Sequence, residues 1–159
     1  MLSLLRFLWF PTAIVLVVLG GLRLDRVLGW HGPHVPWLGR LLVLAGLSLI
    51  AWCGFLFASI GEGTAHPFVA KTKHLVIAGP YRYVRNPMMY GVGALLAGLA
   101  LWLGSLGLWL GIAMFVLFIS LFVPYYEERD MERRFGEEYR EYCRQVPRWL
   151  PRFRAKPRD

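Results

Sequence analysis

The longest uncharged run in the chain constrains its fold more than any other feature. From Met88 to Tyr126, nearly forty consecutive positions carry no acidic or basic side chain. A bilayer core about 30 Å thick is crossed by roughly 20 helical residues that rise about 1.5 Å each. One charge at the centre of a membrane helix costs about 2.5 to 3.5 kcal/mol, so an uncharged run of this length indicates a membrane protein.

The run is long enough for two crossings and must fold back on itself. We predict the break at Leu103-Gly104-Ser105-Leu106-Gly107, with spans near 88–103 and 106–124. Asn86 suits the N-cap of the first span, and Pro87 suits its first turn, where a missing N–H is no loss.

Two further apolar runs precede this hairpin. Phe7 to Leu22 lies between two arginines, and Leu41 to Gly61 has no ionisable side chain except Cys53. The first run, which contains Pro11, could be the apolar part of a signal peptide, but no small-x-small cleavage site follows it. We therefore expect a retained anchor and an all-α, polytopic integral membrane protein with about four transmembrane helices plus an amphipathic cytoplasmic C-terminal helix.

The composition agrees with this fold class. The chain is 57% hydrophobic with a net charge of +8, and its charges lie at the ends of the apolar runs, which excludes an ordinary soluble enzyme. Nucleic-acid binding is not expected, because acids are interleaved with the basic residues of the tail. Cys53 and Cys143 lie in an apolar run and a charged segment respectively, so we expect no disulfide between them.

The distribution of basic residues predicts the orientation. With four crossings, segment 62–87 and the tail from Glu127 lie on one side of the membrane. That side holds Lys71, Lys73, Arg82, Arg85 and ten basic residues of the tail. The other side holds Arg23, Arg26 and Arg40. The positive-inside rule places the richer side in the cytoplasm, and in a bacterium the membrane would be the inner one.

The tail predicts one amphipathic helix that ends at Pro147. A single apolar stripe is formed by Met131, Phe135, Tyr139, Tyr142 and Val146. Asp130 with Arg134, and Glu137 with Arg140, are spaced to form ion pairs. Residues 127–142 carry seven acidic and four basic side chains. Anionic headgroups would repel this face, so we expect the helix to dock on the protein and close over a site.

Small residues four positions apart recur in the hairpin. The pairs are Gly93 with Ala97, Ala94 with Gly98, and Gly107 with Gly111. This spacing lets membrane helices approach closely, although glycine is also common in such helices without that role. If Gly107 and Gly111 are exposed, they would permit a homodimer.

Two blocks carry a resemblance to known enzymes. The first is Gly79-Pro80-Tyr81-Arg82-Tyr83-Val84-Arg85-Asn86-Pro87-Met88-Met89-Tyr90-Gly91, and the second comprises Glu127-Glu128, Phe135-Gly136-Glu137-Glu138-Tyr139, Tyr142, Val146-Pro147 and Pro151. Over about residues 61 to 151 the chain resembles the isoprenylcysteine carboxyl methyltransferase and phospholipid methyltransferase superfamily. The resemblance implies a methyltransferase core at 61–151, after two membrane helices in 1–60 and before a basic tail at 152–159.

The resemblance also implies S-adenosylmethionine as cofactor, no obligatory metal, and a lipophilic or lipid acceptor that enters sideways from the bilayer. The nucleoside would lie beside His74, Leu75, Val76, Gly79 and Tyr81. The methionine end would lie near Arg85, Asn86 and Tyr90, with Glu127 and Glu128 on hydroxyl or ammonium groups.

The acceptor group stays open between a carboxylate and an amine. A carboxylate needs a cation to hold it, for which Arg144 and Arg148 are candidates, and an amine must lose a proton, for which a glutamate such as Glu128 is the candidate. The chain has Asn86 where many members have histidine, and Gln145 where prenylcysteine enzymes have a basic residue. Both departures weaken the case for a carboxylate.

Two other functions fit parts of the pattern. Membrane sterol reductases that bind NADPH share a similar hairpin, but they are longer and have more spans. A non-catalytic membrane adaptor could use the basic loop and the acidic helix to bind partners. The cofactor that the protein binds discriminates among the three.

Overall fold

Every regular element is helical in the part of the chain that the computed structural model describes, residues 2–62 and 73–152. This confirms the predicted all-α class. Lys71 and most of the basic tail lie outside the described residues. In chain order the elements are α1 (Leu2–Leu28), α2 (Pro36–Ser59), the 3₁₀ turn η1 (Gly79–Arg82), α3 (Pro87–Leu103), α4 (Leu106–Phe122), the π turn η2 (Val123–Glu127), α5 (Glu128–Phe135) and α6 (Glu137–Gln145).

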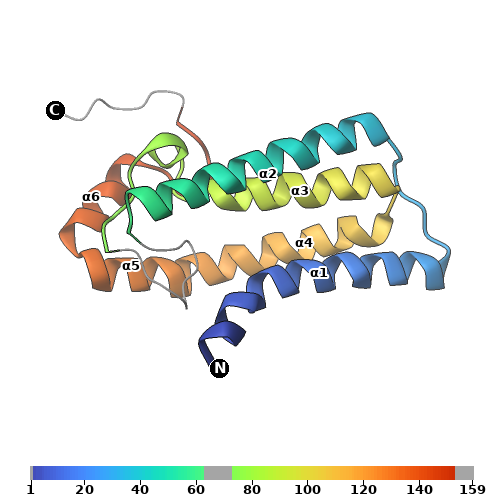
Figure 1. The fold of residues 1–159 in the computed structure, drawn as a ribbon, viewed down its shortest axis with the longest axis horizontal. Coiled ribbons are helices and arrows are strands. Elements are labelled where there is room, and N and C mark those ends of the chain that lie inside the picture. The colour runs from blue at the N-terminus through green and yellow to red at the C-terminus, as the bar shows by residue number, and fades with distance from the viewer. Residues whose placement is uncertain (1, 63–72, 153–159) are drawn as a thin grey trace.

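The four long helices form two antiparallel pairs, α2 with α3 and α1 with α4 (Figure 1). Glycines bring the first pair into backbone contact. A Cβ on Gly98 would lie 2.7 Å from Gly39 O, and one on Gly91 would lie 3.0 Å from Gly46 O. The close approach predicted for Gly98 is confirmed, since a membrane interior supplies no hydrophobic force and packing must hold these helices together.

The second pair corrects an expectation about the surface. Gly107 is buried against Gly21 of α1, and a Cβ on Gly111 would lie 2.6 Å from Val17 Cγ1. Gly107 is therefore not exposed, and Gly111 is half-buried with α1 beside it. Both glycines serve the packing of α1 against α4.

The reversal between α3 and α4 lies at the predicted break. Gly104 takes a left-handed conformation (φ 64°) that ends α3, and Ser105 caps α4 by accepting a hydrogen bond from Leu108 N at 3.0 Å. Asp25 of α1 accepts hydrogen bonds from Gly107 N, at 2.7 Å, and from the Ser105 hydroxyl. A carboxylate thus satisfies free N–H groups at the positive end of α4.

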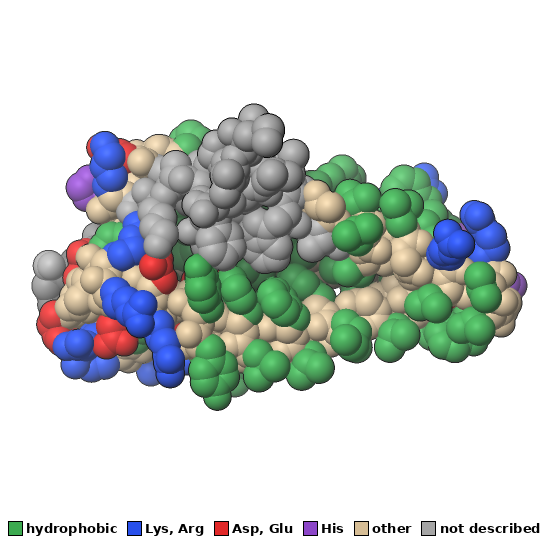
Figure 2. Space-filling view, turned by 90° about the horizontal axis from the view of Figure 1, so that it is seen from below, with side chains coloured by type: hydrophobic (Ala, Val, Ile, Leu, Met, Phe, Trp, Pro, Cys, Tyr) green, Lys and Arg blue, Asp and Glu red, His purple; other side chains and the backbone are tan. Residues whose placement is uncertain are grey.

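Among the described residues, two helices are long and apolar enough to cross a membrane, namely α2 and the continuous helical run Leu106–Phe135. The apolar helix α3 is shorter, at 17 residues. Large apolar side chains point outward along these helices, for example Leu44 on α2 and Leu117 on α4. Figure 2 shows hydrophobic side chains over the middle of the molecule and charged ones at its two ends.

The first two helices are longer at their ends than the apolar runs indicated. α1 covers Leu2–Leu28 where the apolar run spans 7–22, and α2 begins at Pro36 rather than near Leu41. Helix α1 continues past the apolar run through Arg23 and Arg26. These long side chains can reach solvent from the end of the helix, so the backbone stays helical.

The helical run Leu106–Phe135 spans 30 residues, or about 45 Å at 1.5 Å per residue, which exceeds the hydrocarbon core. Its charged part begins at Glu127, outside the apolar segment. The π turn lies at this junction, and Glu128 N donates to Val123 O five residues back. Pro124 explains the turn, since proline has no N–H and its ring clashes with the carbonyl four residues earlier.

The predicted C-terminal helix is two helices rather than one. Gly136 separates α5 from α6 with φ 55° and ψ −124°, a conformation that favours glycine. The predicted stripe nevertheless docks on the protein, where Tyr139, Tyr142 and Val146 pack against Leu75. The predicted ion pairs Asp130–Arg134 and Glu137–Arg140 form as well.

The contact between α2 and α3 leads to a first prediction. Gly98→Ala should lower the free energy of unfolding by about 1 to 3 kcal/mol, because its Cβ has no room between Gly39 O and Val43 N. Gly20→Ala is the control, since a Cβ there meets nothing within 4 Å. Thermal unfolding in detergent measures both, and equal melting temperatures would contradict the packing described.

Candidate functional site

The segment between α2 and α3 joins the membrane helices to the C-terminal helices. Its neighbouring residues Leu75 and Val76 pack into two different clusters. Leu75 packs with Tyr139, Tyr142 and Val146, whereas Val76 packs with α2 and Tyr81. The Tyr142 hydroxyl donates to Tyr81 O at 2.8 Å and fixes α6 to η1.

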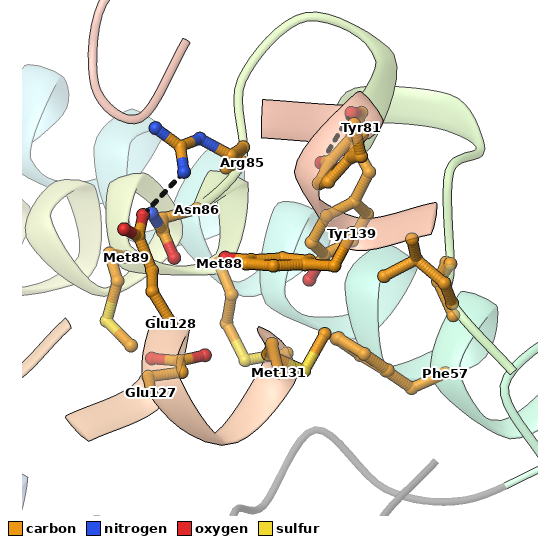
Figure 3. Close-up of a pocket in the computed structure, with 13 residues that line it drawn as sticks. Phe57, Tyr81, Arg85, Asn86, Met88, Met89, Glu127, Glu128, Met131 and Tyr139 are labelled. Carbon is orange, nitrogen blue, oxygen red and sulfur yellow. Dashed lines mark hydrogen bonds and ion pairs between the residues drawn. The ribbon is translucent and has the colours of Figure 1, made fainter. Parts of the chain in front are cut away.

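These contacts enclose a small cavity of about 70 Å³ (Figure 3). It lies where the end of α2, segment 75–89, the start of α5 and helix α6 converge. Its walls are aromatic and apolar, with two charged or amide side chains from the loop before α3 and two carboxylates from the junction of η2 and α5. The lining residues are Phe57, Leu75, Val76, Tyr81, Arg85, Asn86, Met88, Met89, Glu127, Glu128, Met131, Tyr139 and Tyr142.

One carboxylate binds two arginines beside this cavity. Glu128 accepts hydrogen bonds from Arg85 Nη1 at 2.7 Å and from Arg148 Nε and Nη2 at 2.8 and 2.6 Å. The Arg85 and Glu128 side chains are only 13% and 15% exposed, against 36% for Arg148. We call this trio the Glu128 clamp. It links the loop before α3, helix α5 and the segment after α6, which are distant in sequence.

Two groups in the site are left without a polar or charged partner among residues 2–62 and 73–152. Arg85 Nε is buried and has no hydrogen-bond partner, although Nη1 of the same guanidinium also donates to Cys143 Sγ at 2.9 Å. Cys143 and Cys53 are both free, so the expected absence of a disulfide is confirmed. A buried donor without an acceptor costs about 1 to 3 kcal/mol, and such a group at a cavity wall is suited to a ligand.

The second group is the Glu127 carboxyl, which lines the cavity and forms no ion pair with any residue that the structure describes. Removal from water raises the pKa of Glu127 to about 7, with further contributions from the negative charges of Glu128 and Asp130. Burial likewise raises the pKa of Tyr81, Tyr139 and Tyr142, so these phenols stay neutral at physiological pH.

The residues after α6 lie along the beginning of α3. Arg85 N donates to Pro147 O and Arg152 N to Tyr83 O, each at 3.0 Å. Two side chains form further hydrogen bonds to this segment. Asn86 Nδ2 donates to Arg148 O at 3.4 Å, and the Tyr90 hydroxyl donates to Trp149 O. Asn86 holds the predicted N-cap position of α3, but its side chain makes no cap bond and binds this segment instead.

The structure brings most of the sequence-predicted site residues together, with four exceptions. His74 is exposed, and Gly79 packs beside Leu56 and Trp52, so neither lines the cavity. Tyr90 lines a neighbouring groove, and Arg144 pairs with Glu137 and Glu141 on the exposed side of α6. The cavity is lined by the predicted residues Leu75, Val76, Tyr81, Arg85, Asn86, Glu127 and Glu128, with Arg148 in the clamp.

Several lining residues were not predicted as site residues. Met131, Tyr139 and Tyr142 belong to the apolar stripe of the tail, and Met88 and Met89 follow Pro87 in the first block, so the sequence does carry a signal for these five. Phe57 is different, because nothing in the α2 sequence distinguishes it from the other apolar residues there. Its contact with Tyr81, with ring centroids 5.3 Å apart, depends on the fold.

A second hollow adjoins the cavity. It is an apolar groove of about 540 Å³ between α3 and α4, and Met89 lines both spaces. The groove residues are Met89, Tyr90, Gly93, Ala94, Ala97, Phe115, Val116, Ile119, Ser120 and Trp149. The cavity that holds the charged side chains therefore meets an apolar groove between α3 and α4.

Comparison with known proteins agrees with this architecture. The family model for phospholipid methyltransferase matches residues 35–138, from the start of α2 into α6. The chain therefore belongs to the phospholipid methyltransferase family, whose members are membrane methyltransferases acting on lipid-like substrates. No curated protein and no solved structure matches the chain.

The Glu128 clamp leads to a second prediction. Glu128→Ala should lower the free energy of unfolding by about 3 kcal/mol, because it leaves the arginine Arg85 buried without its acceptor. Glu132→Ala removes a carboxylate of the same helix whose pair with Arg140 is exposed, so its effect should be small. Melting temperatures in detergent compare the two, and equal losses would argue against a stabilising role for the clamp.

Glu127 leads to a third prediction, on pH dependence. The pKa of Glu127 is about 7 in the folded state and near 4.5 in the unfolded state. Between pH 4.5 and pH 7 the folded state therefore binds more protons than the unfolded state. Stability should therefore fall as pH rises through this window, by about 3 kcal/mol relative to Glu127→Gln, which cannot ionise. Chemical unfolding of both proteins at pH 5 and pH 8 measures this, and parallel pH profiles would contradict the raised pKa.

Proposed function

We propose that this protein uses S-adenosylmethionine to methylate a lipophilic acceptor that reaches the site from the bilayer. The observation that carries the proposal is the junction at Met89 of a polar, aromatic-walled cavity with an apolar groove between membrane helices. Membership of a lipid-directed methyltransferase family supports it. The topology we propose has four crossings, α1 to α4, with the cavity on the cytoplasmic side, where basic residues are concentrated.

The donor set fits the cofactor. S-adenosylmethionine carries a carboxylate, an ammonium, a ribose diol, an adenine and a cationic sulfonium. The unpartnered Arg85 Nε suits the carboxylate, Glu127 suits a cationic group, and the tyrosine-rich wall suits the adenine. When bound, the cofactor supplies an activated methyl group, which leaves alignment and exclusion of water to the protein.

The cavity volume of about 70 Å³ is well below the roughly 300 to 1,000 Å³ of typical ligand sites. The cavity in this conformation is therefore too small for the whole cofactor. Binding therefore requires side chains at its edge to move. Arg148 is the most exposed member of the Glu128 clamp. Breaking its ion pair therefore requires less free energy than breaking the more deeply buried pair of Arg85 with Glu128. We propose that Arg148 moves on binding while Arg85 and Glu128 stay paired.

The charges favour an amine over a carboxylate as the acceptor group. Glu128 already engages both Arg85 and Arg148, and Arg144 points away from the cavity, whereas the Glu127 carboxyl is unpaired. An ammonium group must lose its proton before it can attack a methyl group. Glu127, with a pKa of about 7, is suited to accept that proton near neutral pH.

The fourth prediction tests the cofactor. Purified protein in detergent should bind S-adenosylmethionine, and Arg85→Ala and Glu127→Ala should each weaken binding by about tenfold or more, the value of one charge-assisted contact. Arg140→Ala is the control, because its pairs with Glu132 and Glu137 lie on the exposed side. Isothermal calorimetry measures the affinities, and circular dichroism checks that the helices persist.

Two outcomes would reject the proposal. Binding of NADPH in place of S-adenosylmethionine would indicate a reductase, and no binding of either would indicate a non-catalytic protein. Affinity for S-adenosylmethionine that neither variant changes would place the cofactor elsewhere. The acceptor is sought separately, by incubating native membranes with cofactor labelled at its methyl group and extracting the lipids.

A further inference from the structure

The groove between α3 and α4 has two unlike walls. The α3 wall is formed by the small residues Gly93, Ala94 and Ala97, and the α4 wall by the larger Phe115, Val116 and Ile119. The groove therefore exists because the side chains on the α3 wall are too small to fill the space between the two helices. From Met89 to Ala97 the α3 wall extends about 12 Å at 1.5 Å per residue, less than half the hydrocarbon core. The groove thus has the depth of one leaflet.

Gly93 is a glycine that helix packing does not require. A Cβ at position 93 would meet nothing within 4 Å, whereas one on Gly91 would lie 2.8 Å from Ile50 Cγ1 and one on Gly98 2.7 Å from Gly39 O. Gly93 has no positive φ that would exclude other residues. Glycine inside a helix costs about 1 kcal/mol relative to alanine. Neither the backbone nor the neighbouring helix explains that cost.

The two hydroxyl groups that line the groove are already hydrogen-bonded to backbone carbonyls. The Ser120 hydroxyl donates to Val116 O at 2.7 Å, and the Tyr90 hydroxyl donates to Trp149 O. An occupant of the groove therefore needs no polar atoms along its length, and a hydrocarbon chain suits it best. Only at Met89, where the groove meets the polar cavity, would a reactive group find charged neighbours.

We propose that Gly93 determines acceptor specificity by setting the width of this groove, which holds one hydrocarbon chain of the acceptor along α3. The chain lies within the cytoplasmic leaflet, with its polar end at Met89 and its tail toward Ala97. The position of the reactive end rests on the proposed methyl transfer, but the chain site itself does not. A larger residue at position 93 narrows the groove without disturbing α2.

The chain site is tested with a palmitoyl chain that carries a photoreactive diazirine, incorporated in phosphatidylcholine nanodiscs with the full-length protein. After illumination, mass spectrometry maps the labelled peptides. We expect labelling of Gly93–Ala97 and Phe115–Ile119 above that of Leu41 and Leu44, which are exposed on α2 outside the groove. Labelling no higher in the groove than on this part of α2 would overturn the proposal.

The role of Gly93 is tested by Gly93→Leu with Gly54→Leu as the matched control. Gly54 lies on α2 outside the groove, and a Cβ there also meets nothing within 4 Å. Gly93→Leu should reduce groove labelling at least about tenfold, since even one methylene in an apolar pocket changes selectivity by that order. Gly54→Leu should leave it unchanged. Equal labelling of the two variants would overturn the assignment of Gly93.

Two further measurements keep the interpretation unambiguous. Gly93→Ala adds less volume than Gly93→Leu and should give an intermediate loss of groove labelling. If Gly93→Leu fails to fold, the labelling of Gly93→Ala tests the role of Gly93. Calorimetry on the same samples should show that Gly93→Leu binds S-adenosylmethionine as the wild type does. If the wild type binds no S-adenosylmethionine, the proposed function fails, while the labelling pattern still decides the chain site.

Discussion

Glu128 binds two arginines at once, and the site depends on this interaction. Its oxygens accept hydrogen bonds from Arg85, in the loop before α3, and from Arg148, in the segment after α6. Two half-buried cations and one anion are stable together, because each arginine would otherwise lose hydration without compensation. The C-terminal helices are thereby held over the loop before α3, and the cavity exists only while they stay there.

The pairing leaves other groups unsatisfied in the same place. Because Glu128 is engaged by both arginines, it cannot serve Arg85 Nε, and the neighbouring Glu127 faces the cavity without a cation. Both glutamates line the cavity, and both lie at the end of the π turn Val123–Glu127, where Pro124 interrupts the α-helical bonding. A structural residue and a candidate reactive residue are thus consecutive in the chain.

The sequence predicts the parts of this fold that depend on local physics. The hairpin, its break at Gly104 and Ser105, and the stripe from Met131 to Val146 follow from charge-free length, turn residues and helical period. It did not reveal that Gly136 divides the tail helix, that Arg144 faces outward, or that Asp25 caps α4. These features depend on which surfaces meet in three dimensions, and Asp25 lies about eighty residues before its partners.

The glycines show how one residue type serves two purposes within a single helix. Gly91 and Gly98 face α2, where no side chain fits, whereas Gly93 faces the groove, where a side chain would fit. The absence of a Cβ therefore lets α2 pack closely on one side of α3 and leaves space for the groove on the other side. Because the open side meets the cavity at Met89, the proposed cofactor could arrive from water and the proposed acceptor chain from lipid, and the two would meet at one point.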